Sequence, residues 1–176
     1  MENYRDFLPE LKTIPLFYGI EDDALIALLE AMQPKIVHRT TGNMPPMKFG
    51  EGIWMLQLKN NLDGSIAPRE NQYAMPNFGE PGAMMGEVPG MSEAFLYRKN
   101  MTMPAPPKPA GPVKEVDDYV LEMSSDMMVK FYSDEVYPAQ AQMNRNMLGI
   151  MAEKVTHIRK MNREQIEALQ KQLEAK

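Results

Sequence analysis

The hydrophobic and polar positions in the first 33 residues predict two short helices joined by an apolar turn. Residues 2–12 place four apolar side chains on one face of a short helix: Tyr4, Phe7, Leu8 and Leu11. The stretch "EDDALIALLEAM" (21–32) has acids in its first turn and an apolar stripe formed by Leu25, Leu28, Leu29 and Met32. Pro34 ends this second helix.

Between residues 34 and 123, short β-type segments replace the helical period. They are "KIVHR", "GIWMLQL", "GSIA" and "YVLEM", and clusters of Gly, Pro, Asn and Asp separate them. This spacing predicts a small antiparallel β-roll or jelly roll, and therefore an α+β fold. The stretch "MPAPPKPAGP" (103–112) lacks backbone donors, so it belongs at an edge, in a bulge or in a long loop.

The last part of the chain predicts a short helix followed by a long one. "SSDMMVKFY" opens with N-cap residues, and Pro138 suits the first turn of a helix that continues to Leu173. Roughly 35 helical residues would measure about 50 Å, which is longer than a domain of this size needs. The helix carries a seam at a and d spacing, consisting of Leu148, Met151, Val155, Ile158 and Asn162, and after one stutter of Ile166, Leu169 and Leu173. The seam predicts a parallel homodimer, with packing wholly onto its own domain as the alternative.

Composition limits the compartment, the cofactors and the partners. The chain has 176 residues, no cysteine, 18 methionines that suit flexible core filler, and a formal net charge of −5. The lack of cysteine excludes disulfides and Cys-ligated metal centres and fits a reducing compartment. The negative charge argues against a dedicated nucleic-acid binder. No apolar run approaches the ~18 residues that span a bilayer, and the N-terminus lacks a signal-peptide pattern, so we expect a cytoplasmic protein with no membrane partner.

One region combines glycine, proline and charge: "EPGAMMGEVPGMSEAFLYR" (80–98). Glycine permits positive φ and lets main-chain N–H groups approach an anion closely, so this loop could cradle a phosphate. The same composition suits an ordinary surface turn, and both interpretations stay open. The other candidate groups are two isolated histidines and two acid pairs that suit cap and turn positions: His38, His157, Asp22-Asp23 and Asp117-Asp118. Without a catalytic triad motif or paired metal ligands, we predict neither catalytic residues nor a metal site.

The order of elements and several local sequences resemble the effector half of Crp/Fnr-type transcription regulators, which carry a cyclic-nucleotide-binding-like domain. "IPLFYGIEDDALIALLEAM" is similar to the family's Pro-Leu-Phe turn and acidic helix, and "EPGAMMGE" fits its PG-x-x-x-GE loop. "TTGNMPPMKFGEG" and "LDGSIAPRE" resemble its first β-roll turns and a strand start, and "AEKVTHIRK" resembles the middle of its dimer helix. The resemblance covers about residues 10 to 170, in patches.

The resemblance implies a ligand site. Gly82, Gly86 and Glu87 would form the phosphate-binding cassette, with the Glu at a ribose hydroxyl and backbone N–H groups around the phosphate. Arg98 would supply the cation, one position later than in the family. The effector would be a cyclic nucleotide or another small anion.

The resemblance also implies an organisation and a function. N-terminal helices (1–33) would precede a β-roll effector-binding domain (34–123) and a dimerisation segment (124–176). The chain would be a ligand-sensing, dimerising effector domain of a transcription regulator. The family's DNA-reading helix-turn-helix has no counterpart in this sequence, so we expect a homodimer without specific DNA binding. The alternative is a non-catalytic structural module, degenerate or designed, with a β-roll shape and no functional ligand pocket.

Overall fold

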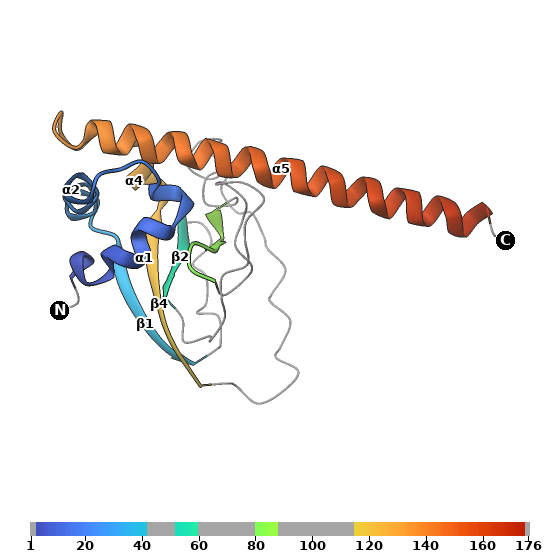
Figure 1. The fold of residues 1–176 in the computed structure, drawn as a ribbon, viewed down its shortest axis with the longest axis horizontal. Coiled ribbons are helices and arrows are strands. Elements are labelled where there is room, and N and C mark those ends of the chain that lie inside the picture. Colours follow the sequence, from blue (N-terminus) through green and yellow to red (C-terminus); the bar gives the residue numbers. More distant parts are fainter. Residues whose placement is uncertain (1–2, 42–51, 60–79, 88–114, 175–176) are drawn as a thin grey trace.

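The computed structural model describes residues 3–41, 52–59, 80–87 and 115–174. These residues form a four-stranded antiparallel sheet, a group of N-terminal helices beside it, and a long C-terminal helix that extends well past the sheet (Figure 1). The α+β class predicted from the sequence is therefore confirmed.

The N-terminal helices are shorter and more divided than the sequence pattern predicts. The single helix expected over residues 2–12 is a 3₁₀ turn followed by a short α-helix, because the proline at position 9 falls in the first turn of the latter, where its missing N–H costs nothing. The four elements are η1 (Tyr4–Phe7), α1 (Leu8–Thr13), η2 (Pro15–Phe17) and α2 (Asp22–Met32). Helix α2 begins and ends close to its predicted bounds.

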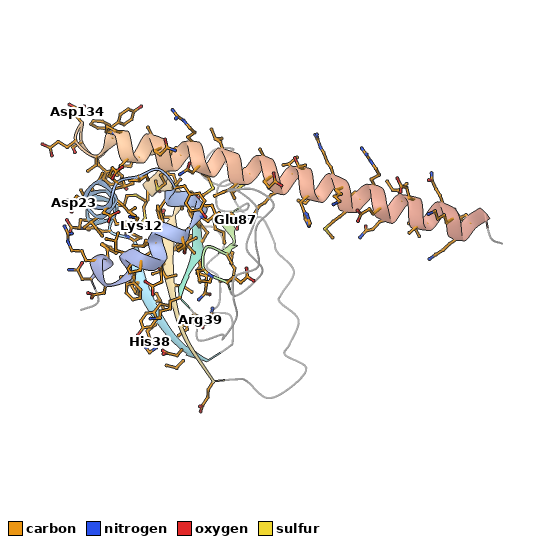
Figure 2. All side chains as sticks on the ribbon, viewed as in Figure 1. Lys12, Asp23, His38, Arg39, Glu87 and Asp134 are labelled. Atoms are coloured by element: carbon orange, nitrogen blue, oxygen red, sulfur yellow. The ribbon has the colours of Figure 1, made fainter. Side chains whose placement is uncertain are left out.

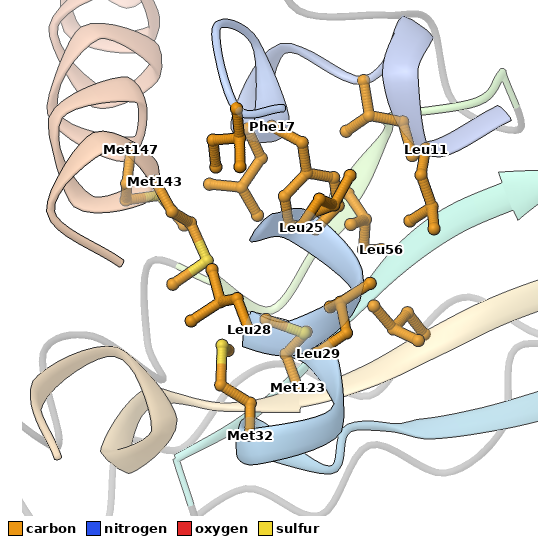
Figure 3. Close-up of a cluster of buried hydrophobic side chains, with 14 of the residues drawn as sticks. Leu11, Phe17, Leu25, Leu28, Leu29, Met32, Leu56, Met123, Met143 and Met147 are labelled. Atoms are coloured by element: carbon orange, nitrogen blue, oxygen red, sulfur yellow. The ribbon is translucent and has the colours of Figure 1, made fainter. Parts of the chain in front are cut away.

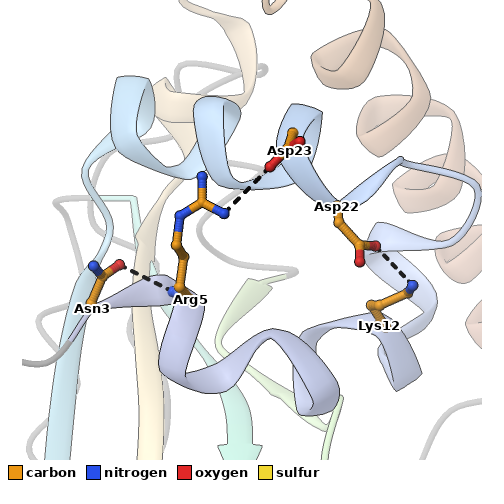
Figure 4. A network of polar contacts seen from close by, with 5 residues as sticks. All are labelled: Asn3, Arg5, Lys12, Asp22 and Asp23. Atoms are coloured by element: carbon orange, nitrogen blue, oxygen red, sulfur yellow. Dashed lines mark hydrogen bonds and ion pairs between the residues drawn. The ribbon is translucent and has the colours of Figure 1, made fainter.

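Two acids in the first turn of α2 connect it to the helices before it (Figure 4). Lys12 Nζ lies 2.7 Å from an oxygen of Asp22, and Arg5 lies 3.3 Å from an oxygen of Asp23. The Asn3 side chain accepts a hydrogen bond from the Arg5 backbone N–H at 3.1 Å. These ion pairs are exposed, and water screens the attraction between their charges, so they contribute little to stability.

The sheet brings the first and last strands of the chain together. Its order is β1-β4-β2-β3, and every neighbouring pair is antiparallel. The strands are β1 (Lys35–Thr41), β2 (Ile53–Lys59), β3 (Met84–Met85) and β4 (Glu115–Ser124). Three of the four predicted strands are confirmed as parts of β1, β2 and β4. The fourth, "GSIA", and the proline-rich stretch 103–112 lie outside the described residues.

One hydrophobic cluster joins the helices, the sheet and the first half of the long helix (Figure 3). Leucines from α2, Trp54 and Leu56 from β2, and Leu121 from β4 are fully buried in it. Methionines complete the packing, among them Met32, Met123, Met128, Met143 and Met147. The reading of methionine as core filler is thus confirmed for these side chains, since a flexible thioether fits the irregular gaps where helices meet a sheet.

The C-terminal part consists of α4 (Ser125–Val129) and α5 (Tyr137–Glu174). Ser124 caps α4 by accepting a hydrogen bond from the Asp126 backbone N–H, as its sequence predicts, but the helix ends before the aromatic pair of "VKFY". The first turns of α5 pack against the body, where the Asn146 amide donates to the carbonyls of Leu16 and Tyr18 at 3.0 and 2.8 Å. Every described side chain of α5 from position 155 to 173 is exposed, so the helix does not pack wholly onto its own domain.

Candidate functional site

The glycine turn before Glu87 has the backbone conformation that its sequence indicates. Gly82 and Gly86 both have positive φ, 87° and 80°, on either side of the short strand β3. The Gly82 N–H donates to the Gln57 carbonyl at 2.7 Å, and the Gln57 N–H donates to the Ala83 carbonyl at 2.9 Å. The turn is therefore fixed to strand β2, and both glycines adopt the left-handed region that other residues avoid.

Glu87 follows this turn (Figure 2). Its carboxylate forms an ion pair with Lys154 of α5. Glu87 is only 4% exposed, and the Lys154 side chain is also largely withdrawn from water. Burial lowers the pKa of Lys154 to about 8, because an ammonium group loses hydration on leaving water. A partly buried pair of this kind fixes the distance between the turn and the helix.

The ion pair changes the interpretation of the candidate ligand residues. We expected Glu87 to offer an open carboxylate to a ligand, with Arg98 as the neighbouring cation. In the structure, Lys154 is the cation at Glu87, and Arg98 lies outside the described residues. Gly82, Gly86 and Glu87 lie in one turn, and the Glu87 carboxylate is paired within the protein itself.

The predicted dimer seam is presented to solvent for most of its length. Leu148 is 71% exposed, and Val155 and Ile158 are also about half exposed. Asn162 lies exposed on the same helix, whereas Met151 is half-buried against the core. The exposed apolar side chains therefore form a row along the part of α5 that its own domain does not cover.

A separate apolar groove lies beside the N-terminal half of α5. It encloses about 570 Å³, and its lining comes from α4, the connection after it and α5: Met128, Val129, Lys130, Phe131, Tyr137, Gln140, Asn144, Met147, Leu148 and Met151. Gln140 Nε2 donates to the Met128 and Lys130 carbonyls at 3.2 and 2.7 Å, and Asn144 Nδ2 donates to the Met128 carbonyl at 3.0 Å. The two side-chain carbonyl oxygens, Gln140 Oε1 and Asn144 Oδ1, are buried and have no hydrogen-bond partner among the described residues.

The acid pair at 117–118 belongs to strand β4 and not to a turn, which corrects the prediction. His38 Nε2 lies 2.6 Å from an Asp117 oxygen, and the His38 ring stacks on Tyr119 at 4.5 Å between centroids. Burial raises the pKa of Asp118, the nearby charge of Arg39 lowers it and that of Asp117 raises it. His38 is thus held by neighbouring strand residues, in a structural arrangement.

The described part of the chain shows no group of three or more His, Asp or Glu side chains that could hold a metal ion. No described helix is long and apolar enough to cross a membrane. Comparison of the chain with models of known protein families, with curated proteins and with solved structures finds no match. The function is therefore argued from the geometry of the turn and of α5.

Sequence reasoning missed two features of this region, Lys154 and the groove. Lys154 lies among several charged residues in "AEKVTHIRK", and nothing local separates a buried lysine from a solvated one. The sequence gives a partial signal for the groove. Val129 and Phe131 are apolar, but the sequence pattern assigns them to no buried face of a helix. Both features depend on segments that are distant in sequence.

Proposed function

We propose that the protein is a ligand-sensing, dimerising effector module of the Crp/Fnr type, with a β-roll around the described sheet. The observation that carries the proposal is the ion pair between Glu87 and Lys154. It links the glycine turn, the candidate ligand site, to the helix that presents the apolar seam. A ligand that alters the turn would act directly on α5.

The chemistry of the turn suits a small anionic effector that also carries a hydroxyl group. Glycines with positive φ allow backbone N–H groups to approach an anion, and Lys154 adds a cation beside them. With a pKa of about 8, Lys154 is largely protonated at neutral pH. An entering phosphate would compete with Glu87 for Lys154 and would free the Glu87 carboxylate to accept a hydrogen bond from a hydroxyl group. A cyclic nucleotide has both groups.

The exposed seam of α5 supports homodimerisation as the second half of the function. The apolar side chains of the seam would gain free energy when a second copy covers them, at about 25 cal/mol per Å² of apolar surface. The lack of cysteine supports a cytoplasmic location, and the net charge of −5 supports a role without specific DNA binding by this chain alone.

One observation favours a second candidate, a structural dimer module without an effector. Glu87 is buried and already neutralised by Lys154, so the turn has no need of an external ligand. In this case the ion pair would hold the sheet to α5 permanently.

Calorimetry and sedimentation together test these candidates. We expect the wild-type chain to sediment as a dimer at micromolar concentration and to release or absorb heat with cyclic AMP, cyclic GMP or inorganic phosphate. Lys154→Gln should abolish that heat, and Lys154→Arg, which keeps the charge, should retain it in part. A dimer that binds none of these probes at millimolar concentration would support the structural module, and a monomer would contradict both candidates.

A further inference from the structure

The groove beside α4 is elongated and follows the first half of α5. Gln140 Nε2 donates to the Lys130 carbonyl at 2.7 Å, and Asn144 Nδ2 donates to the Met128 carbonyl at 3.0 Å. These hydrogen bonds place Lys130 beside the first turns of α5 and Met128 slightly further along the helix. The lining then continues along α5 to Met151. The helix rises roughly 16 Å between positions 140 and 151, at about 1.5 Å per residue.

Most of the groove wall is apolar. The apolar and aromatic side chains that line it are Met128, Val129, Phe131, Tyr137, Met147, Leu148 and Met151. The unpaired oxygens of Gln140 and Asn144 are buried below this surface, so they offer no acceptor to a molecule in the groove. Methionine side chains adapt to the shape of what they contact, so this wall suits a flexible apolar chain.

One end of the groove carries a positive charge. Lys130 is the charged side chain among the described residues that line the groove. It is exposed, its Nζ lies 5.3 Å from the centroid of the Tyr132 ring, and it forms no ion pair with a described residue. Asp134 and Glu135 belong to the same connection but do not line the groove. The groove therefore combines a cation near the start of α5 with an apolar wall that extends away from it.

We infer that this groove binds a fatty acid of about twelve carbons, with its carboxylate at Lys130 and its acyl chain along α5 toward Met151. The groove volume of about 570 Å³ lies in the usual range of small-molecule sites. An extended chain advances about 1.25 Å for each carbon–carbon bond of about 1.5 Å, so about twelve carbons match the length of the wall.

The charge and the wall together select this ligand class. A neutral apolar molecule would leave the Lys130 ammonium without a counter-charge, and a nucleotide would place polar groups against an apolar wall at a cost in free energy. Neither the glycine turn nor Lys154 lines the groove in the described part of the chain. The site is thus separate from the proposed effector site, and the inference goes beyond the proposed function.

Calorimetry with sodium salts of saturated fatty acids, below the concentrations at which they form micelles, tests the site. From octanoate to dodecanoate, each added methylene should tighten binding about fourfold, as expected for its burial. Tetradecanoate should gain less per methylene, because its chain exceeds the apolar wall. Dodecanoate with a photoreactive diazirine at the chain end should label residues 147–151, as located by mass spectrometry.

A charge-specific variant separates this site from unspecific binding of an amphiphile. Lys130→Met removes the charge and should weaken dodecanoate about fivefold, as for an exposed ion pair. Its affinity for the uncharged 1-dodecanol should stay within about twofold of wild type. Lys160→Met removes another exposed lysine of α5 that does not line the groove, and should leave both affinities within about twofold.

Several results would overturn the inference. They are an unchanged dodecanoate affinity in Lys130→Met, a label outside residues 128–151, displacement of dodecanoate by excess cyclic AMP, and association with lipid vesicles in place of dodecanoate binding. Binding that appears only after dilution into monomers would show that a second copy covers the groove, and the inference would also fail. None of these results decides whether the glycine turn binds an effector, because the phosphate and cyclic-nucleotide titrations test that site separately.

Discussion

Glu87 in the glycine turn and Lys154 in α5 form an ion pair across 67 positions of sequence, with both side chains largely withdrawn from water. The contact joins the end of the described loop to the point where α5 leaves the body. Beyond this pair, the side chains of α5 are exposed. The same contact therefore marks the boundary between the packed half and the projecting half of the helix.

A double-mutant cycle should measure this coupling. Lys154→Met leaves the Glu87 carboxylate buried without a partner, and we expect a loss of about 3 kcal/mol in the free energy of unfolding. Glu87→Gln should cost about 1 kcal/mol, because Lys154 is less buried and reaches water more easily. The double variant should lose less stability than the sum of the losses in the two single variants. We expect the difference to be about 1 kcal/mol or more, within the range found for residues that contact each other. Urea unfolding followed by fluorescence of the single tryptophan, Trp54, is the measurement; strict additivity would show that the two groups do not interact.

Stability should rise with pH between about 8 and 10.5 through Lys154. Its pKa is about 8 in the folded chain and 10.5 in the absence of burial, so in this window the unfolded chain binds more protons at this residue. By linkage, we expect a gain of about 2 kcal/mol between pH 7.5 and 9.5. The neutral Lys154 amine still donates a hydrogen bond to Glu87, which methionine cannot do. Lys154→Met should therefore be less stable at every pH and should also lack this gain, and the difference in slope is the quantity to measure. The upper limit of pH 9.5 avoids Tyr4 and Tyr132, whose raised pKa values act in the opposite direction above pH 10.

Gly86→Ala should destabilise the turn by about 1–2 kcal/mol, because an alanine side chain is strained at a φ of 80°. Gly86→Asn is the matched control, and it should cost less, since asparagine tolerates the left-handed region better. Thermal unfolding of both variants tests the prediction. Equal losses would mean that space around the residue, and not backbone strain, sets the cost.

Charge in the projecting seam should dissociate the dimer without unfolding the chain. Val155→Asp combined with Ile158→Asp places two carboxylates in a surface that we propose to be buried between copies, at a cost of several kcal/mol. Both side chains are about half exposed in the single chain, so its thermal stability as a monomer should hardly change. Thr156→Asp, which lies off the seam, is the control. Sedimentation velocity that shows unchanged dimers for the double variant would disprove the seam.

The chain should show no sequence-specific affinity for DNA. Its net charge is −5, and any weak association should disappear as salt rises, because only counterion release could drive it. Fluorescence anisotropy with two unrelated duplexes, at low and at physiological salt, is sufficient. Nanomolar binding to one duplex at physiological salt would contradict the prediction.

The projecting half of α5 shows how far a sequence pattern reaches. The a and d spacing identified the seam from Leu148 to Asn162, and the exposed side chains of α5 agree with a surface that its own domain does not cover. Periodicity assigns side chains to faces, and only packing shows which face the domain itself covers.

The sequence by itself determined the elements whose causes are local. Apolar spacing and acidic first-turn residues specify α2, Ser124 specifies the start of α4, and the two glycines at 82 and 86 specify a turn with positive φ. Each of these features depends on residues within a few positions of one another, so a short stretch of chain contains the whole reason for it.

Tertiary structure alone decided the contacts on which a function can be built. Strand β4 lies between β1 and β2, although 55 positions of sequence separate Lys59 from Glu115 at the nearest strand ends. The pairing of Glu87 with Lys154 and the groove between α4 and α5 likewise join distant segments. Such contacts depend on which surfaces the folded core buries together. The residues next to a charged side chain in a helix do not show whether that side chain will be buried in such a contact.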